Sequence, residues 1–241
     1  MSYIKPVFKY KNTLHKQELK SSKCLLTISV GQEVHEDDKL AATLDLVNAS
    51  FGSCIILIDD SLQRHSMALN ESKAADFFYE SSLLEGDSWL ERNKKYYQSL
   101  SILQDIIRWD TWLKHRDFPE QQQKIKSLMA EEAEYQESFD KTIDEFLRRY
   151  YPRLIETEHF DIERARTLCL DYLIEECTAL CLWPTLECHY EVYPSPRNFA
   201  MHETHQRFVI PSFPTLLHAI SIKFKNRKQL KPQSFKSSQE A

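Results

Sequence analysis

Short apolar runs rich in β-forming residues alternate with segments of helical period in the first part of the chain. The runs at residues 24–30 and 53–58 are typical of buried strands. Between them, apolar residues recur at the spacing that forms one stripe of a helix, and Gly52 ends this helix. The residues of the stripe are Leu40, Leu44, Val47 and Phe51. Strand, helix and strand within about 35 residues predict a βαβ unit, whose two strands are parallel.

The middle of the chain has the pattern of three helices. Asp87 is placed to cap the first of them. The strongly charged stretch 120–150 forms the second, which is expected to end at Pro152. The third covers 161–183, where Pro184 stops it.

The last part of the chain returns to shorter elements. Alternation predicts a strand over 187–193, and residues 214–222 are expected to form a short closing helix. We find no internal repeat and no linker, so a single α/β domain is predicted over 1–241. Its polar ends are expected to be a loosely attached arm at 1–22 and a disordered basic tail at 223–241.

The chain contains only three glycines, Gly31, Gly52 and Gly86. A Walker loop or a GxGxxG dinucleotide turn needs several glycines close together. The GxSxG turn of serine hydrolases is also missing. The usual ATP and NAD sites are therefore excluded, and we expect no cofactor.

Cysteine usage and hydropathy point to the cytoplasm. No apolar run approaches the roughly 20 residues that span a bilayer, and the N-terminus lacks the apolar core of a secretory signal. The six cysteines lie in apolar stretches, as is usual in a reducing compartment. A zinc site at Cys177, Cys181 and Cys188 is a minor alternative, because no CxxC or HxxxH pair accompanies them. We expect no metal.

Glu176 falls in the middle of the apolar stripe of the predicted helix 161–183. A wheel turning about 100° per residue surrounds it with Ala165, Cys169, Tyr172, Leu173, Ala179, Leu180 and Trp183. A buried carboxylate is costly unless it is paired or neutral, so such groups occur mainly at functional sites. Tyr172 shares this face, and a structural Tyr–Glu bond, or a glutamate bridged to arginine, is the alternative. Glu175 lies to the side and is expected at the surface.

Polar residues at strand ends offer further candidates. Ser29 ends the first strand, at the edge where open parallel sheets bind ligands. A strand-end serine that satisfies backbone groups is the alternative. In 187–193, alternation places Tyr193 and Glu191 opposite the core face. Tyr193 can then face a polar cavity, and Glu191 either lies on its wall or is a solvated edge charge.

A local basic face is compatible with the formal net charge of −5, which argues only against a general nucleic-acid coat protein. Arg92 and Lys95 share a helix face with Lys94 nearby, and such a face can hold phosphates. A solvated helix surface is the alternative. The same two possibilities apply to the tail residues Lys223, Lys225, Arg227 and Lys228.

Four short segments have the order and spacing of motifs in the tRNA-dependent cyclodipeptide synthases, which the chain resembles over 23–222. They are Leu26-Thr-Ile-Ser29-Val-Gly31, Trp89-Leu-Glu-Arg-Asn93, Tyr172-Leu-Ile-Glu175-Glu176 and Tyr193-Pro194. The resemblance implies a Rossmann-like parallel sheet flanked by helices, similar to the catalytic domain of class I aminoacyl-tRNA synthetases. It also implies an enzyme that consumes two aminoacyl-tRNAs per turnover and releases a cyclic dipeptide.

The resemblance also assigns roles. Ser29 would be the nucleophile that accepts the first aminoacyl group. Tyr172 and Glu176 would hold its amino group, with Glu176 also moving protons, and Tyr193 would assist cyclisation. Pro194 after the motif tyrosine is typical of one branch of the family; the other branch has histidine there and asparagine at the position of Gln32.

We expect substrate binding by Gly31, Gln32 and Glu191, and tRNA binding by Arg92, Lys94 and Lys95. Two other functions stay open. The first is another acyl-transfer enzyme or hydrolase that acts on aminoacyl-tRNA. The second is a non-catalytic tRNA-binding module.

Overall fold

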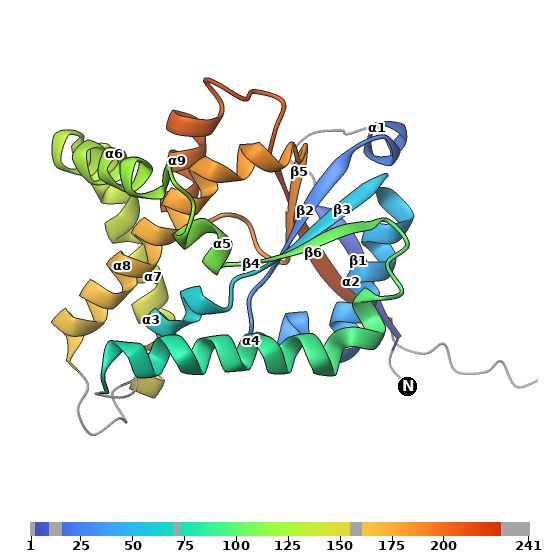
Figure 1. Ribbon diagram of the computed structural model, residues 1–241, viewed down its shortest axis with the longest axis horizontal. Helices are drawn as coiled ribbons and strands as arrows, with labels where there is room; N and C mark the ends of the chain where they lie inside the picture. The colour runs from blue at the N-terminus through green and yellow to red at the C-terminus, as the bar shows by residue number, and fades with distance from the viewer. Residues whose placement is uncertain (1–2, 10–15, 70–72, 155–160, 228–241) are drawn as a thin grey trace, which may run out of the picture.

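One mixed six-stranded sheet forms the centre of the molecule (Figure 1). The computed structural model describes residues 3–9, 16–69, 73–154 and 161–227. The strand order is β1-β6-β5-β2-β3-β4. The strands are β1 Tyr3–Lys9, β2 Lys23–Ile28, β3 Ser53–Ile58, β4 Leu103–Arg108, β5 Tyr190–Tyr193 and β6 His218–Arg227. Neighbours are parallel except β1, which pairs antiparallel with β6 at the edge.

The strand order reverses direction at β2. From β2 the chain continues to β3 and β4 on one side, whereas β5 and β6 add to the other side of β2. Ligands of open α/β sheets bind at such a switch point, beyond the carboxyl ends of the strands. The carboxyl ends of β2 and β5 therefore define where a site is expected.

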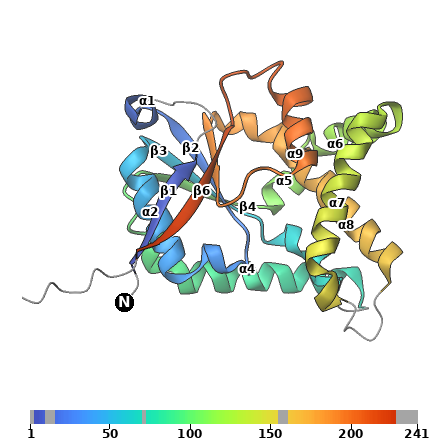
Figure 2. The same cartoon turned by 180° about the vertical axis from the view of Figure 1, so that it is seen from behind.

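Helices cover both faces of the sheet (Figures 1 and 2). Their bounds are α1 Lys16–Lys20, α2 Asp37–Ser50, α3 Arg64–Met67, α4 Ala75–Tyr97, α5 Asp110–Leu113, α6 Phe118–Glu131, α7 Ala133–Leu154, α8 Ile162–Leu182 and α9 Phe199–Thr204. Short 3-10 turns cover Glu33–His35, Ser61–Gln63 and Trp183–Leu186, and a π-turn covers His205–Val209. Residues of α2 and α4 pack on one face, and residues of α6 to α9 pack on the other.

The central strands are apolar on both faces, which explains their continuous hydrophobic runs. In β2, Leu25 belongs to the core beneath α8, and Leu26 belongs to the core beneath α2. Ile55 and Ile56 of β3 divide between the two cores in the same way. The predicted βαβ unit is confirmed, with β2 and β3 parallel and in register over all six residues.

Helix α8 is the other element that the sequence located well. It spans Ile162–Leu182, and the Asp161 carboxylate caps it by accepting hydrogen bonds from the backbone N–H groups of Glu163 and Arg164. The helix ends at Leu182, just before the 3-10 turn Trp183–Leu186 that contains Pro184. The position of Glu176 on the helix wheel therefore holds in three dimensions.

The helix that Asp87 was expected to cap begins twelve residues earlier, at Ala75. Asp87 lies in the middle of α4, where its carboxylate pairs with Arg108 at the end of β4. Gly86 beside it allows this approach, because a Cβ there would collide with Asp60 and Arg108. The stretch 120–150 forms two helices, α6 and α7, and α7 continues past Pro152 to Leu154.

Both polar ends of the domain differ from expectation. Residues 3–9 form β1, and the predicted helix 214–222 is wrong, because β6 starts at His218 and runs across the expected boundary at 223. β6 pairs with β5 on one side and with β1 on the other, and these backbone hydrogen bonds replace the ones that a helix would make. Residues 228–241 lie outside the described part of the chain.

The expected strand 187–193 is shorter at its start, since β5 covers Tyr190–Tyr193. Glu187 has a left-handed φ of 54° and ends the 3-10 turn after α8. In the described residues, no helix has the length and apolar character that crossing a bilayer requires.

Candidate active site

Ser29 directly follows β2 and lies at the switch point of the sheet, beside the end of β5. Leu26 of β2 pairs with Val192 of β5, and the two strands are parallel. The next residues, Tyr193 after Val192 and Thr27 to Ser29 after Leu26, therefore lie side by side at the same end of the sheet. The Ser29 side chain is buried and lines a cavity of about 560 Å³. The predicted position of Ser29 at a ligand-binding edge is thus explained by strand order.

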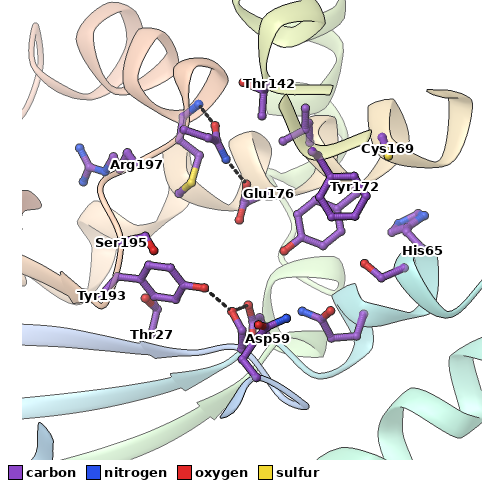
Figure 3. Close-up of a pocket in the computed structure, with 18 of the residues that line it drawn as sticks. Thr27, Asp59, His65, Thr142, Cys169, Tyr172, Glu176, Tyr193, Ser195 and Arg197 are labelled. Carbon is purple, nitrogen blue, oxygen red and sulfur yellow. Dashed lines mark hydrogen bonds between the residues drawn. The ribbon is translucent and has the colours of Figure 1, made fainter. Parts of the chain in front are cut away.

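The Ser29 hydroxyl has two polar neighbours. Its Oγ lies 2.9 Å from Tyr193 Oη and donates a hydrogen bond of 2.9 Å to Asp59 Oδ2. Asp59 directly follows β3, the neighbour of β2, so the two side chains extend from adjacent strand ends. Figure 3 shows the phenol of Tyr193 directed toward Asp59 across the cavity floor.

A buried histidine orients the backbone of Ser29. His35 Nδ1 accepts a hydrogen bond of 2.9 Å from the Ser29 N–H, and the imidazole packs against the ring of Tyr193 at 5.4 Å. Trp89 Nε1 donates to the His35 carbonyl oxygen at 3.0 Å and holds this turn on α4. Burial lowers the pKa of His35 to about 4, so the ring is neutral at physiological pH.

Asp59 was missed in the sequence, where it served only to end a strand. Burial raises the pKa of its carboxyl well above the usual value, and the nearby charge of Glu176 acts in the same direction. The hydrogen bond from Ser29 opposes this shift by favouring the carboxylate. The sequence contained one indication of its role. Asp59 follows the second parallel strand as Ser29 follows the first, so both residues must lie at the same edge of the sheet.

Helix α8 supplies the opposite wall of the cavity. Tyr172 and Glu176 both line it, and their phenol and carboxyl groups point into the space above Asp59 (Figure 3). Burial raises the pKa of Glu176 to about 7, which a hydrogen bond of 3.2 Å from Asn198 to Glu176 Oε2 partly offsets. Burial likewise raises the pKa of Tyr172 above its usual range. Ser29, Tyr172, Glu176 and Tyr193 are thus brought together as expected.

The placement of Glu175 at the surface was wrong. Its side chain is buried, and the Arg64 guanidinium pairs with both carboxylate oxygens. Trp109 Nε1 donates to Glu175 Oε1 at 2.7 Å, and His65 Nε2 lies 3.3 Å from Oε2. These partners keep the pKa of Glu175 below its usual value despite burial. The arginine bridge considered for Glu176 is made by its neighbour instead.

Glu191 is a buried wall residue of the cavity and not a solvated edge charge. Arg197 pairs with it at 2.5 Å and donates a second bond, of 2.6 Å, to the Leu217 carbonyl oxygen. Both side chains are almost fully buried, at 5% and 7% exposure, so they form a fixed charged wall beside Tyr193.

Gln32 lines the cavity, whereas Gly31 is not among its lining residues. Gly31 instead has a φ of 82°, which suits a residue without a Cβ and turns the chain from β2 into the 3-10 turn at Glu33–His35. Gly31 therefore has a conformational role at this turn, and its expected part in substrate binding stays a prediction.

The basic side chains of α4 that were expected to bind tRNA, Arg92, Lys94 and Lys95, are only partly available to a ligand. Arg92 pairs with Glu36 at 2.7 Å and with Glu85 at 2.9 Å. Lys94 is exposed, and Lys95 Nζ lies over the ring of Tyr96 at 4.6 Å. Lys94 Nζ also lies 4.0 Å from Glu91 Oε2, so Arg92 and Lys94 are both compensated within the protein.

A second basic surface lies on the edge of the sheet. Lys5, Lys9, Lys223 and Lys225, here called the basic ribbon, are all exposed residues of β1 and β6. Registers place the four on the sheet face of Tyr193, because Tyr193 pairs with Ser221 and Ser221 pairs with Lys9. Lys5 and Lys225 are directly opposite each other, an arrangement that repels.

No group of three or more His, Cys, Asp or Glu side chains suited to a metal occurs within 3–9, 16–69, 73–154 and 161–227. Cys177, Cys181 and Cys188 are free thiols. Burial raises the pKa of Cys181 and of Cys188 to about 12.

The fold and the site define a Rossmann-like α/β enzyme with a serine at the switch point of its sheet. A scan against protein-family models finds no match, and a search of curated proteins finds none either. Among solved structures, a cyclodipeptide synthase (CDPS) from Fluoribacter dumoffii is 38% identical, with a TM-score of 0.88, and the match covers 94% of this chain and 100% of that one. The chain belongs to the cyclodipeptide synthase family.

Two more distant structures share the fold. The cyclodipeptide synthase from Candidatus Glomeribacter gigasporarum bound to Phe-tRNAPhe is 19% identical, with a TM-score of 0.74, over 92% of this chain and 94% of that one. A Mycobacterium tuberculosis protein, whose structure relates cyclodipeptide synthetases to type I tRNA synthetases, is 8% identical, with a TM-score of 0.60, over 91% and 92%. The expected relation of the fold to class I synthetases is thereby confirmed.

Proposed function

We propose that this protein joins the aminoacyl groups of two aminoacyl-tRNAs into a cyclic dipeptide, through an aminoacyl group and then a dipeptidyl group carried on Ser29. The observation that supports this most is the meeting of Ser29, Tyr193, Tyr172 and Glu176 in one cavity. Membership of the cyclodipeptide synthase family supports the same reaction.

Acylation of Ser29 needs no ATP, because the ester of an aminoacyl-tRNA is already activated. The Ser29 oxygen attacks the ester carbonyl carbon, and the terminal ribose oxygen of the tRNA leaves. The aminoacyl group then lies between the sheet and α8, within reach of Tyr172 and Glu176, which line the opposite wall. A carboxylate and a phenol are suitable partners for its ammonium group.

Peptide-bond formation follows when the amine of the second aminoacyl-tRNA attacks the aminoacyl ester on Ser29. This amine must be neutral, and Glu176 has a pKa of about 7, which suits it to accept and return protons near neutral pH. The resulting dipeptidyl ester closes when its own terminal amine attacks the ester carbonyl. Tyr193 Oη, 2.9 Å from Ser29 Oγ, is placed to stabilise that departing oxygen.

The cavity favours apolar aminoacyl side chains on the side away from the sheet. Its wall there is made mainly of apolar groups, which bury a hydrocarbon or aromatic side chain at little cost. They are Leu69, Ile143, Phe146, Leu168, Leu173 and Met201. We therefore propose that at least one of the two amino acids is large and apolar.

The sequence branch is a finer part of the proposal. Pro194 follows Tyr193, and Gln32 lines the cavity near Ser29. We propose that the chain belongs to the branch with proline after the motif tyrosine. In that case Gln32 contributes an amide to substrate binding, where the other branch has asparagine.

The basic ribbon is our first candidate for holding the phosphates of tRNA. It shares the sheet face of Tyr193, and neither β1 nor β6 contains an acidic residue. The repulsion between Lys5 and Lys225 is relieved when anions bind between them. Lysines also protect edge strands from aggregation, which is the alternative role. Lys94 and Lys95, with Arg92, form the second candidate surface.

Product analysis tests the proposed function. The full chain is expressed in a bacterium, and the medium is analysed by mass spectrometry beside a Ser29→Ala strain. A new cyclic dipeptide in the wild-type medium alone supports the proposal. A linear product, or faster release of free amino acid from purified aminoacyl-tRNA, would instead identify a hydrolase or another transferase.

A binding module is separated from an enzyme by covalent labelling. Radiolabelled aminoacyl-tRNA is incubated with the purified protein, which is then denatured and freed of tRNA. The enzyme retains label and the Ser29→Ala variant does not. Binding of tRNA with no label in the wild type would favour the non-catalytic module.

A further inference from the structure

We propose that Asp59 is the acid–base group of the acylation step, taking the proton from the Ser29 hydroxyl and returning it to the departing ribose oxygen of the tRNA. This inference rests on the proposed function, because it concerns the first step of that reaction. Asp59 is a catalytic residue in this account, since its carboxylate contacts the reacting oxygen atom directly.

The geometry selects Asp59 among the groups around the nucleophile. Ser29 Oγ donates to Asp59 Oδ2 at 2.9 Å, so the proton already points at the carboxylate. Since a hydroxyl carries one proton, the contact between Ser29 Oγ and Tyr193 Oη is then a bond donated by the phenol. The three groups form a directed chain from Tyr193 through Ser29 to Asp59.

His35 and Glu176, the histidine and the other carboxyl group considered for this role, are engaged elsewhere. His35 Nδ1 accepts the backbone N–H of Ser29 and is not bonded to its hydroxyl. Glu176 Oε2 accepts from Asn198 at 3.2 Å on the opposite wall of the cavity. Asp59 is therefore the carboxyl group in hydrogen-bond contact with the nucleophile among the described residues.

The second carboxylate oxygen of Asp59 is available to accept a hydrogen bond. Asp59 Oδ1 is buried without a protein partner among the described residues, although the side chain lines the cavity. A buried acceptor without a partner is costly, so it is expected to receive a donor from a ligand. The hydroxyl of the departing terminal ribose is such a donor.

The step balances in atoms and protons. As Ser29 Oγ forms its bond to the ester carbonyl carbon, its proton passes to the Asp59 carboxylate. The tetrahedral intermediate then breaks the bond to the ribose oxygen, which takes the proton from Asp59. The products are aminoacyl-Ser29 and deacylated tRNA, and Asp59 is again a carboxylate. Burial makes this carboxylate a stronger base than an exposed one, because it raises the pKa of Asp59.

The test measures single-turnover labelling of the full chain with tRNA charged from a radiolabelled amino-acid mixture. Asp59→Asn keeps the shape of the side chain and removes the base. We expect its rate of Ser29 labelling to fall about a hundred-fold or more, the usual contribution of general base catalysis. Thermal unfolding measured in parallel shows that the variant is folded.

A cysteine nucleophile separates base catalysis from a structural role. A thiol ionises near pH 8.5 and so depends much less on a neighbouring base than a hydroxyl does. In the Ser29→Cys background, adding Asp59→Asn is expected to change the labelling rate by less than about three-fold. Equal losses in the serine and cysteine backgrounds would assign Asp59 a structural role and overturn the inference.

Failure of this inference differs from failure of the proposed function. If the wild type takes no label, the function proposed for the chain is wrong. If the wild type is labelled and Asp59→Asn is labelled at the same rate, the function stands and the role of Asp59 is rejected.

Discussion

Glu175 and Glu176 are neighbours in α8, yet the pKa values of their carboxyl groups are shifted in opposite directions. The Arg64 guanidinium, the His65 ring and the Trp109 indole keep Glu175 charged, with a pKa below its usual value. Glu176 is half-buried on the cavity wall, and loss of hydration there raises its pKa to about 7. One helix turn thus provides both an anchor for α3 and a group that can exchange protons.

The first prediction concerns the pH dependence of stability. Between about pH 4.5 and 7, unfolded Glu176 loses its proton and folded Glu176 keeps it, so stability falls as pH rises through this window. A shift from 4.5 to about 7 amounts to ~3 kcal/mol. Glu176→Gln removes this loss, and urea unfolding should find the variant more stable than wild type above pH 7 and similar below pH 4.5. An equal difference at both extremes would contradict the raised pKa.

The second prediction concerns the Arg64–Glu175 pair. Arg64→Met leaves the buried Glu175 carboxylate without its guanidinium, and breaking such a pair costs about 3 kcal/mol. Urea unfolding measures the loss. Glu175→Gln is expected to cost less, because it leaves Arg64, which is partly exposed, to be solvated.

Lys39→Met is the matched control for this pair, since its partner Glu33 is 88% exposed, whereas Glu175 is buried, and the Lys39–Glu33 pair should contribute nothing measurable. If Arg64→Met is no more destabilising than Lys39→Met, the buried network does not anchor α3 to α8.

The third prediction separates acylation from cyclisation. Tyr193→Phe keeps the ring that packs on His35 and removes the hydroxyl beside Ser29. Labelling of Ser29 should fall by no more than about ten-fold, the worth of one hydrogen bond. Release of cyclic dipeptide should fall further, so that dipeptidyl-enzyme accumulates and is detected as intact-protein mass.

Tyr190→Phe serves as the control, because Tyr190 is on the core face of the same strand. Parallel losses of labelling and of product in Tyr193→Phe would remove the phenol from the cyclisation step.

The fourth prediction identifies the tRNA surface. Each lysine that contacts a phosphate contributes about 0.7 to 0.9 to the slope of log affinity against log salt. Lys5→Gln with Lys225→Gln should therefore weaken tRNA binding and lower that slope by nearly two units, as measured by filter binding over a salt series.

Lys94→Gln with Lys95→Gln is the competing variant, and Lys124→Gln, which removes a lysine paired with Glu120 on α6, is the neutral control. An unchanged slope in the ribbon variant together with a reduced slope in the α4 variant would transfer the tRNA surface to α4.

The chemistry on α8 and β5 was accessible from sequence because both elements are strictly periodic. The 3.6-residue period placed Glu176 on the buried stripe, and the alternation of β5 separated Tyr193 from the core residue Val192. Glu175 was assigned to the surface by the same wheel, because a wheel records the angle of a side chain and not what packs there. Arg64 comes from a segment 111 residues away.

The misplaced elements depended on long-range pairing. In β6 the apolar residues Ile220, Ile222 and Phe224 alternate as in a strand, but the first residues of the segment also fit a helix. The segment forms a strand because it pairs with both β5 and β1. Asp59 was overlooked for the same reason. Its partner Ser29 is 30 residues away and becomes a neighbour only through the parallel pairing of β2 and β3.

The mass of the Ser29 peptide after reaction with aminoacyl-tRNA tests the central claim most directly. Protein quenched in acid during turnover is digested and sequenced by mass spectrometry. We predict an added aminoacyl mass on Ser29 in the wild type, and no added mass anywhere in Ser29→Ala. An adduct on another side chain, or one that persists in Ser29→Ala, would contradict the assignment of Ser29 as the nucleophile.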